Sequence, residues 1–542
     1  MAENHLVGTT DFHLIEAAVT WRAYLICGFA SFGGILFGYD SGYISGVLGM
    51  DYVKKQYGHP VPMTEDPSGF MIGTSRKSLI TSILSAGTFI GALAGGGISE
   101  SVGRRITIMI SCLIFAIGVA VQVGTNTVSA FVVGRFIAGL GVGGVSATVI
   151  LYVSEISPRK VRGLLISVYQ WAITIGLLVA SGVAQGCKDR NGTASYRIPI
   201  GLQFVWAAIL AGGLFMLPES PRYYVRCGRI NDALRSLERV RGQPSSNPAI
   251  QAELAEIQAN FEYEKKIAST SWSDCFKGGM SRRGNLRRVI AGCCLQMFQQ
   301  WTGINFIFYY GTTFFQQVGI KNAFLISTIT NVVNVVATPA SFYMIEKFGR
   351  RSLLIWGALA MCFSEFVVAI VGVAKEGSHT ALNHRSICLI VFTCFYIASF
   401  AMTWGPAAWV VIGEIYPLPI RAKGVALATA SNWLWNCIIA VITPFIVDKD
   451  KGNLGVKVFF VWGSALVLCC LFAFFVIPET KSLTLEQVDK MFEETTPMRS
   501  AKWKPHDTFA HQMGMTNQPE INILSDERKP SHITTLEEHD II

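Results

Sequence analysis

The groups in this chain that could do chemistry are polar side chains placed inside long apolar runs. Among them are amides, which both donate and accept hydrogen bonds: Gln170, Gln299, Gln300, Asn305 and Asn432. Such a set can bind a neutral ligand that carries many hydroxyl groups. The alternative is that the amides bond helices to one another inside a membrane, where each bond contributes about 1 kcal/mol.

A carboxylate stands at Asp40, in a run that is otherwise uncharged from Ala23 to Met50. A charge inside a membrane is costly unless it is protonated or paired, so Asp40 is a candidate functional residue. Arg135 lies in another apolar run and is its natural partner, because an arginine can form a bidentate pair with a carboxylate. The alternative is a static ion pair that locks two helices together.

Charged motifs occur twice in the same order, about half a chain apart. Each copy has Gly-Arg-Arg, then a glutamate followed seven residues later by an arginine, then Pro-Glu. The copies are Gly103-Arg104-Arg105, Glu155, Arg162 and Pro218-Glu219, and Gly349-Arg350-Arg351, Glu414, Arg421 and Pro478-Glu479. This order indicates a duplicated membrane domain.

The apolar runs that must position these groups are long enough to be membrane helices. Of the 542 residues, 51% are hydrophobic and 15% are charged, against about 25% charged in soluble proteins. Runs of about 20 residues, enough to cross a bilayer, lie near 23–46, 78–99, 106–124, 128–152, 163–186, 198–217, 289–316, 322–345, 352–374, 386–412, 424–447 and 456–477. We therefore expect an all-α membrane protein with twelve transmembrane helices in two six-helix halves.

The basic residues predict how the chain is oriented. Arginines and lysines concentrate in the connections on one side of the membrane. By the positive-inside rule this side is cytoplasmic, and both termini lie on it. The expected segments are an N-terminal tail (1–21), a first half (22–218), a helical linker (219–285), a second half (286–478) and a mostly disordered tail (479–542). The linker has amphipathic stretches at 232–240 and 249–266.

Other classes of function find little support in the sequence. No metal-ligand cluster, nucleophile–base set or phosphate-binding loop stands in a water-accessible segment, so we expect no enzyme, cofactor or metal. The positive charge gathers at membrane ends, which disfavours nucleic acid as a partner. No cleaved signal peptide is expected, and Asn191 begins a glycosylation sequon in an external loop.

The motifs resemble the sugar porter family of the major facilitator superfamily over about residues 22–490. Beyond the duplicated motifs, the resemblance is carried by Pro218-Glu219-Ser220-Pro221-Arg222 and by Gln299-Gln300-x-x-Gly303-x-Asn305. Phe37-Gly38-Tyr39-Asp40 and Gly405-Pro406-Ala407-Ala408-Trp409 are most similar to fungal hexose and pentose transporters. Glu100 and Glu346 stand where the superfamily often has aspartate, which keeps the charge.

This resemblance implies a plasma-membrane monosaccharide transporter that works by alternating access, as a monomer. It places the five amides at the sugar, with aromatic walls from Phe37, Tyr309, Trp409 and Trp433. In proton-coupled relatives the aspartate that matches Asp40 carries the proton and the arginine that matches Arg135 tunes its affinity, so we expect symport. Passive facilitators of fungi also carry this aspartate, so a uniporter is the alternative. A sugar sensor of the same fold is a further alternative, which the short tail disfavours.

The cytoplasmic charges are expected to form a gate. Ion pairs among them can hold the inner end shut and break when the halves rock; the set is Arg104, Glu155, Arg162, Glu219, Arg222, Arg350, Glu414, Arg421 and Glu479. The alternative is that these charges only set the orientation in the membrane. Glu365 has no counterpart that we can name in the family; Arg385 or water on the lipid side could satisfy it.

Overall fold

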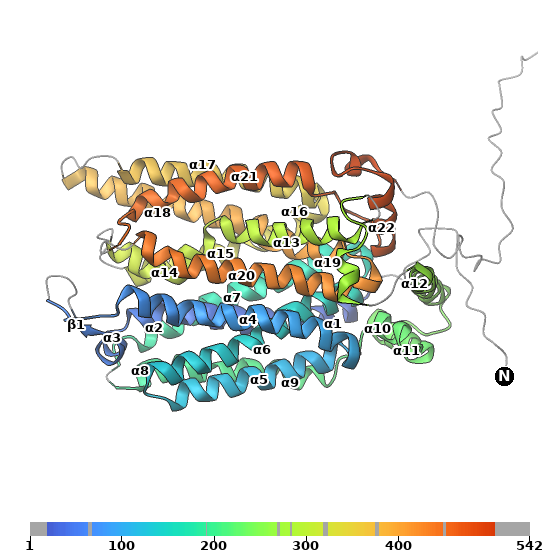
Figure 1. Cartoon of the computed structure of the whole chain (residues 1–542), viewed down its shortest axis with the longest axis horizontal. Helices are drawn as coiled ribbons and strands as arrows, with labels where there is room; N and C mark the ends of the chain where they lie inside the picture. Colours follow the sequence, from blue (N-terminus) through green and yellow to red (C-terminus); the bar gives the residue numbers. More distant parts are fainter. Residues whose placement is uncertain are drawn as a thin grey trace, which may run out of the picture.

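The computed structural model describes residues 19–62, 68–190, 192–267, 271–281, 284–317, 323–373, 379–447 and 451–504. Within these ranges the chain forms two bundles of helices that lie side by side (Figure 1). The described strands are one antiparallel pair, β1 (His59–Pro60) and β2 (Phe70–Met71), at the end of the bundle opposite the linker. The fold is therefore all-α, as predicted.

The first half contains six membrane crossings, of which the first and the last are each built from two helix segments. Its helices are α1 (Trp21–Ala30), α2 (Gly33–Gly49), α3 (Asp51–Tyr57), α4 (Thr74–Val102), α5 (Arg104–Gly124), α6 (Val128–Ile156), α7 (Arg162–Cys187), α8 (Ala194–Gly201) and α9 (Gln203–Leu214). The segments α1–α2 and α8–α9 each continue as one span, whereas α3 is a short helix that follows α2.

The second half repeats this plan with more broken helices. Its helices are α13 (Asn285–Trp301), α14 (Ile304–Gln317), α15 (Ala323–Ala337), α16 (Ala340–Phe348), α17 (Arg350–Val373), α18 (His379–Met402), α19 (Trp404–Glu414), α20 (Arg421–Val447) and α21 (Val458–Val476). Ten helices of the described ranges are long and apolar enough to span a membrane, and the pair α15–α16, bent by 45°, makes an eleventh. The broken pair α13–α14 is the twelfth, so the predicted twelve-helix fold is confirmed.

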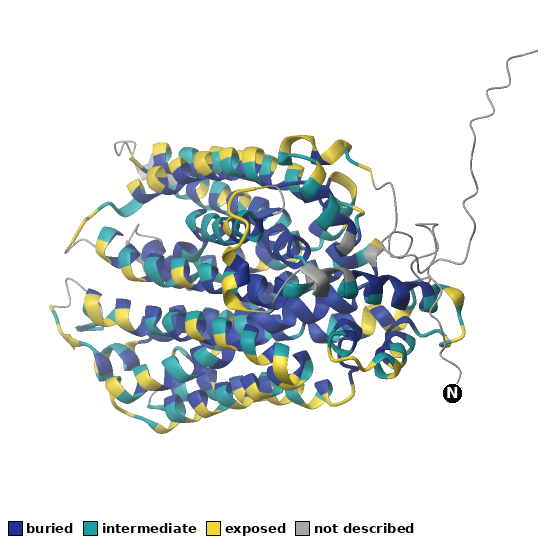
Figure 2. Cartoon of the chain, turned by 45° about the vertical axis from the view of Figure 1, so that its right-hand side comes forward, coloured by how far each residue is buried: buried dark blue, intermediate teal, exposed yellow. Residues whose placement is uncertain are grey.

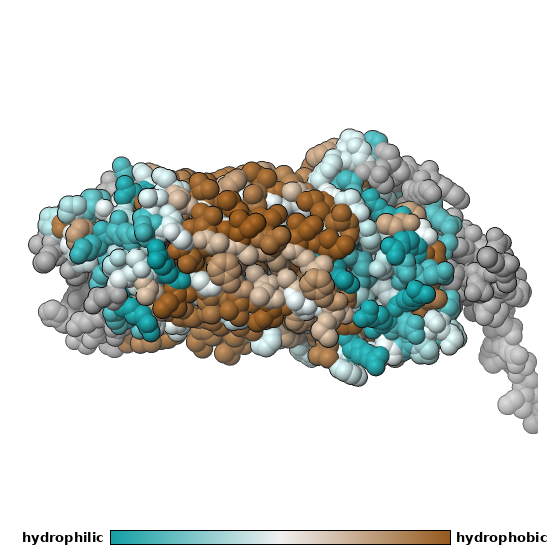
Figure 3. Space-filling view, turned by 90° about the horizontal axis from the view of Figure 1, so that it is seen from below, coloured by the Kyte–Doolittle hydropathy of each residue, from teal (hydrophilic) through white to brown (hydrophobic). Residues whose placement is uncertain are grey.

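The outer surface of the bundle suits a bilayer. On the face that Figure 3 shows, hydrophobic residues form a belt across the middle and hydrophilic residues gather at both ends. Large apolar side chains on this surface are exposed, among them Trp356, Phe363 and Ile370 of α17. Buried residues lie on the inward faces of the helices (Figure 2). A helix pairs its own backbone N–H and C=O groups, so only its side chains face the lipid. Apolar side chains at the surface therefore suit a membrane.

The break between α13 and α14 requires glycine. Gly303 has φ of +83°, which disfavours other L-residues. A Cβ atom at this position would also lie 2.6 Å from Cγ of Trp462 in α21. The break that the sequence allowed at Gly303 is therefore present, and it directs the residues on either side of it toward the second half's inner face.

The linker folds close to its prediction. It contains α10 (Pro221–Arg226), α11 (Ile230–Arg241) and α12 (Pro248–Ile267), which lie against one end of the bundle (Figure 1). Leu237 of α11 and Leu254 and Ile257 of α12 share a small apolar core. The remaining short turns are η1 (Arg159–Val161), η2 (Trp272–Phe276), η3 (Leu418–Ile420), η4 (Gly455–Lys457) and η5 (Pro497–Lys502).

The prediction of a mostly disordered segment from residue 479 is wrong for its first part. Residues 485–494 form helix α22 (Leu485–Glu494), and η5 follows it. A capping box between Thr484 and Gln487 begins the helix, and the apolar side chains Val488, Met491 and Phe492 are buried against the bundle. The polar composition of this segment hides its one-sided apolar pattern. Residues 505–542 lie outside the described residues.

Candidate functional site

A cavity with about 510 Å³ of empty space, part of it open to solvent, lies between the two halves. The first half lines it with Phe37, Ser41, Gln170, Ile173 and Leu177. The second half lines it with Gln299, Gln300, Ile304, Asn305, Phe308, Tyr309, Phe400, Trp409, Asn432 and Asn436. Because both halves contribute, a change in their relative position changes the cavity.

Gln299 is held in place by backbone and side-chain groups of two neighbouring helices. Its Nε2 donates to the carbonyl oxygens of Trp404 (3.1 Å) and Gly405 (3.0 Å), at the start of α19. Its Oε1 accepts from Nδ2 of Asn432, 2.8 Å away in α20, and the same Nδ2 lies 2.7 Å from Oε1 of Gln296. The amide therefore has a fixed orientation at the cavity wall.

A second group of amides is centred on Asn436 of α20. Its Nδ2 donates to Oε1 of Gln300 (3.1 Å), which also accepts from Asn305. Its Oδ1 accepts from the hydroxyl of Tyr309 (3.2 Å) and from Oγ of Ser85 (2.7 Å), a residue of α4 in the first half. Asn436 was not among the predicted residues. Its spacing of four from Asn432, which places both on one helix face, is the signal that could have found it.

The structure brings together eight of the nine residues predicted to contact sugar, all of which line this cavity. Trp433 is the exception: its indole Nε1 donates to Oγ of Ser146 (3.1 Å), and its ring packs 4.7 Å from the ring of Phe37. Trp433 thus supports a wall residue and is not part of the wall. Several amides bond helices together and line the cavity at once, so bonds between helices do not prevent these amides from facing a ligand. Contact with sugar stays a prediction.

Asp40 and Arg135 do not form the expected bidentate pair. Asp40 is fully buried in α2, and among the described residues neither carboxylate oxygen has a hydrogen-bond partner. Arg135 donates instead from its guanidinium to the hydroxyl of Tyr43, 2.6 Å away, which in turn donates to Oε1 of Gln122 (2.8 Å). Tyr43 lies about one helical turn from Asp40 and takes the hydrogen bond that the carboxylate was expected to receive.

The duplicated charged motifs fold into duplicated contacts. Arg104 pairs with Glu155 at 2.8 and 3.0 Å, and Arg350 pairs with Glu414 at 2.9 and 3.2 Å. All four side chains are buried. The pairing joins helices of the same half in each case, so these pairs brace each half at its inner end.

The two Pro-Glu motifs complete this pattern. The Glu219 carboxylate accepts the backbone N–H groups of Arg104 and Arg105, and Glu479 accepts those of Arg350 and Arg351. Burial raises the pKa of Glu219, and the backbone N–H groups that bond it act in the opposite direction. Each glutamate caps the start of a helix, where the helix dipole favours negative charge.

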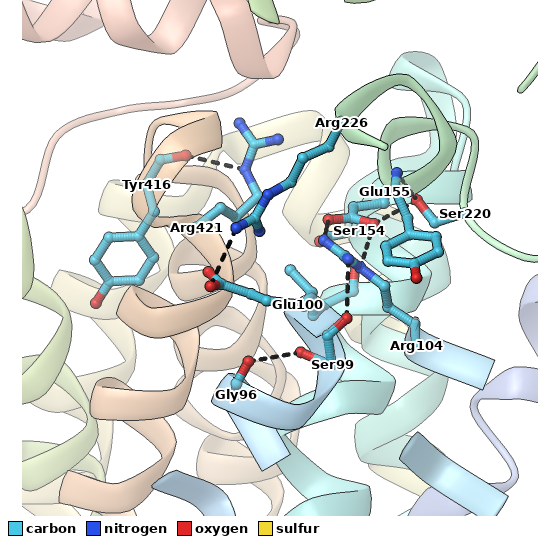
Figure 4. A network of polar contacts seen from close by, with 12 residues as sticks. Gly96, Ser99, Glu100, Arg104, Ser154, Glu155, Ser220, Arg226, Tyr416 and Arg421 are labelled. Atoms are coloured by element: carbon cyan, nitrogen blue, oxygen red, sulfur yellow. Dashed lines mark hydrogen bonds and ion pairs between the residues drawn. The ribbon is translucent and has the colours of Figure 1, made fainter. Parts of the chain in front are cut away.

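Contacts between the halves at this end include residues outside the predicted gate set. Lys423 of α20 lies 2.7 Å from the carboxylate of Glu100 in α4. Glu100 also pairs with Arg226 of α10 at 3.2 Å (Figure 4). The carboxylate of Glu346 in α16 accepts the backbone N–H of Leu164 in α7 (3.2 Å). These contacts hold the inner ends of the halves together.

The remaining predicted gate residues lie at the same end. Arg421 donates to the carbonyl oxygen of Tyr416 (3.0 Å) and is close enough to Glu155 to interact with it electrostatically (Figure 4). Arg162 and Arg222 are buried there too. The pairs Arg104–Glu155 and Arg350–Glu414 lie within one half each, and the gate role of the whole set stays a prediction. Asn191 lies outside the described residues, as does the side chain of Arg385.

Known proteins provide an independent comparison. A family model described as "Sugar (and other) transporter" matches residues 26–492. The major facilitator-type transporter ecdD of Aspergillus rugulosus is 45% identical over 501 residues, covering 90% of this chain and 91% of that protein. The high glucose sensor RGT2 of Saccharomyces cerevisiae is 44% identical over 479 residues, which are 88% of this chain and 61% of the sensor's length. The low-affinity glucose transporter HXT3 of the same yeast is 37% identical over 488 residues, 89% of this chain and 84% of HXT3.

A solved bacterial structure matches the fold. The proton:xylose symporter XylE bound to 6-bromo-6-deoxy-D-glucose has a TM-score of 0.74 and 27% identity, covering 87% of this chain and 99% of that one. The inward open conformation of XylE from E. coli has a TM-score of 0.64 and 28% identity, covering 86% and 99%. The structure is thus more similar to the ligand-bound form than to the inward open form.

Proposed function

The chain belongs to the sugar transporter family of the major facilitator superfamily, and we propose that it carries a monosaccharide across the plasma membrane by alternating access, together with a proton. The observation that carries this proposal is the cavity between the halves. Amides that donate and accept stand beside aromatic rings, and a sugar presents hydroxyl groups on its edge and C–H groups on its faces. The cavity wall offers both kinds of contact that a single sugar ring needs.

Glucose is the substrate to test first. Two of the relatives are named for glucose, and the matching bacterial structure holds a glucose analogue. The wall also contains apolar residues such as Ile173 and Phe308, which can pack against the C–H groups of the ring. Pentoses remain within the proposal, because a missing hydroxymethyl group changes affinity and not the mode of binding.

Alternating access is supported by the contacts at the inner end. The salt bridge between Glu100 and Lys423 and the hydrogen bond from Leu164 to Glu346 join the halves there. The pairs Arg104–Glu155 and Arg350–Glu414 brace each half internally, so each can move as a unit. Opening toward the cytoplasm then requires the loss of a few contacts between the halves. The lower similarity to an inward open structure agrees with a closed inner end.

Proton coupling is proposed from the position of Asp40. Its buried carboxylate has no hydrogen-bond partner among the described residues and shares α2 with Phe37 and Ser41 of the cavity wall. Such a group is stable only if it is protonated or if a cation approaches it. Arg135 is bonded to Tyr43 in this conformation and could turn to Asp40 in another. A passive facilitator, in which Asp40 keeps one state, is the competing mechanism.

The proposal includes the orientation and state of the protein. We place both termini in the cytoplasm, because the arginine-rich linker helices α10 and α11 lie at the inner end of the bundle. One chain contains the whole cavity, so a monomer is sufficient for transport. A glucose sensor is the second candidate function, favoured by the 44% identity to RGT2.

The deciding experiment is uptake of labelled glucose into liposomes that hold the purified protein, with a more acidic solution outside. Accumulation above the external concentration that a protonophore abolishes would support symport. Uptake that stops at equal concentrations would make the protein a facilitator. Glucose binding without uptake would favour a sensor. If the folded protein neither bound nor took up hexoses or pentoses, the proposed substrate class would be refuted.

A further inference from the structure

Glu365 of α17 is a buried carboxylate that the proposed transport mechanism does not use. It is fully buried, and within the described ranges neither of its oxygens has a hydrogen-bond partner. The ionisable groups facing it are Tyr396 of α18, Cys469 of α21 and Cys362 of its own helix. None of these is a cation, so the described surroundings offer no counter-charge for an ionised Glu365.

The expected partner Arg385 is poorly placed for this role. It stands in α18 about three turns before Tyr396, roughly 16 Å away along the helix axis. Its side chain lies outside the described residues. Glu365 itself is about 12 Å from the external end of α17, so it is not at a membrane surface where a lysine or arginine would ordinarily reach it.

Tyr396, which faces Glu365, is bonded to the broken helix of the cavity. The tyrosine hydroxyl donates to the carbonyl oxygen of Thr302, 2.7 Å away. Thr302 follows the last residue of α13 and precedes Gly303, where the chain turns into α14. This carbonyl cannot be paired within a continuing helix, because the helix ends there. The bond from Tyr396 therefore satisfies a backbone group that the break exposes.

A hydroxyl has one proton, and this fixes how Tyr396 can meet Glu365. Because the proton of Tyr396 is given to Thr302, the tyrosine oxygen can only accept from Glu365. A protonated carboxyl can donate to it, whereas an ionised carboxylate has no proton to give. An ionised Glu365 would compete with Thr302 for the single proton of Tyr396.

We propose that Glu365 is a second proton-binding site, which positions the break between α13 and α14 through Tyr396. With a proton taken from water, Glu365 donates to Tyr396, and Tyr396 keeps its bond to Thr302. When the proton returns to water, the tyrosine proton turns to the carboxylate and the Thr302 carbonyl loses its donor. The break then loses a support that only the protonated state allows.

The consequence for binding rests on the proposed function. Gln299 and Gln300 precede Thr302, and Ile304 and Asn305 follow Gly303, and all four line the cavity. Loss of the Tyr396 bond should disturb both sides of the break together. Glucose should therefore bind more weakly as Glu365 loses its proton, which makes Glu365 a positioning residue and not a sugar contact.

The first test does not depend on transport. Infrared difference spectra of the purified full chain in lipid nanodiscs, recorded across a pH titration, follow the C=O stretch of protonated carboxyl groups. We expect a band that titrates in the native protein, is absent from Glu365→Gln and is kept in Ser364→Ala. Ser364 is the matched control, because its hydroxyl bonds Ala360 of its own helix at 2.8 Å. Spectra that are the same for the native protein and Glu365→Gln, or a band that never titrates, would overturn the proposal.

The second test measures glucose affinity over the same pH range in four proteins. The native dissociation constant should rise several-fold with pH, and Ser364→Ala should follow it. Glu365→Gln, which keeps a donor toward Tyr396, should stay near the low-pH value at every pH. Tyr396→Phe should stay near the weak, high-pH value. Repeating the series with Asp40→Asn removes the other proposed proton site from the comparison.

The outcomes separate the two proposals. If the Glu365 infrared band titrated but the glucose dissociation constant varied with pH equally in the native protein and in Glu365→Gln, the link to the helix break would be refuted. Absence of glucose binding in every variant, with the infrared band intact, would count against the proposed substrate and leave the proton site standing. Size-exclusion chromatography of each variant excludes misfolding as the cause of a lost signal.

Discussion

Ser85 donates a hydrogen bond to Asn436 across the interface of the two halves, with 2.7 Å between Oγ and Oδ1. Asn436 also contacts Gln300 and Tyr309 of the cavity wall. The relative position of the halves is therefore linked directly to the orientation of polar groups in the cavity. A movement that separates α4 from α20 at this level must break this bond, and Asn436 must then find another donor or meet water.

Removing this bond should weaken sugar binding. Ser85→Ala deletes a hydrogen bond between buried groups, which contributes about 1 kcal/mol. We expect the KM for glucose to rise about fivefold, as measured by exchange in proteoliposomes. Ser111→Ala is the control, because its hydroxyl bonds a carbonyl of its own helix at 2.8 Å. An unchanged KM in Ser85→Ala would mean that Asn436 keeps its orientation without this donor.

Asp40→Asn should abolish uphill transport and leave exchange of glucose largely intact. Asparagine keeps the shape of the side chain but cannot gain or lose a proton in this range. The measurement compares accumulation driven by a pH gradient with counterflow at equal pH. Asp51→Asn, at the exposed start of α3, should behave like the native protein. Accumulation that survives in Asp40→Asn would remove Asp40 from the proton path.

Gln299→Ala should raise the KM for glucose strongly. The change removes a proposed sugar contact and also leaves the Trp404 carbonyl and the Asn432 amide without a bond that each now has. A loss of about 1–3 kcal/mol corresponds to roughly 5- to 150-fold. Ser464→Ala, on the exposed face of α21, should change nothing. If initial uptake rates gave the same KM for Gln299→Ala and the native protein, Gln299 would be a purely structural amide.

Helix α22 should contribute to the stability of the second half. Asp489 pairs with Arg288 of α13, and both side chains are mostly buried. The guanidinium also lies 4.5 Å from the ring centre of Phe492. Asp489→Ala leaves a buried arginine without its carboxylate, so we expect a fall in Tm of several degrees. Lys502→Ala, at an exposed position, is the control. If Asp489→Ala and the native protein had equal Tm values in detergent, α22 would be only loosely attached to the second half.

The sequence allowed the membrane helices and their duplication to be predicted, because apolar runs and motif order are local properties. The break at Gly303 and the residues of the cavity wall could also be inferred, in part from the family resemblance. The partners of the charged residues could not. Arg104 and Glu155 recur at matched spacing with Arg350 and Glu414, but spacing does not tell whether a pair forms within a half or between halves.

Competition for hydrogen bonds explains the other differences. Arg135 could bond either Asp40 or Tyr43, and the choice depends on side-chain positions that periodicity does not determine. Asn436 lies in an apolar helix and resembles any packing amide until its three hydrogen-bond partners, Ser85, Gln300 and Tyr309, are known. Composition alone does not predict helix α22, because polar residues dominate it although its apolar residues share one face.

The salt bridge between Glu100 and Lys423 provides the sharpest test of alternating access. The two side chains come from different halves and are mostly buried, with 11% and 4% of their side-chain surfaces exposed. Lys423→Met keeps the length of the side chain and removes its charge. We expect the inward open state to gain about fivefold in population, for a coupling of about 1 kcal/mol. Hydrogen exchange should therefore become faster at the inner ends of α4 and α20.

A charge exchange shows whether this effect comes from the pair itself. Glu100→Lys alone should open the inner end further, because it also faces Arg226. Combining Glu100→Lys with Lys423→Glu should recover part of the protection, but not all of it, since Arg226 then lies beside a lysine. Lys347→Met, at an exposed position in α16, controls for the loss of a positive charge. If the double variant exchanged no more slowly than Glu100→Lys alone, the pair would not be what closes the inner end. The contact between Glu346 and Leu164 would then be the next to remove, because it also joins the two halves there.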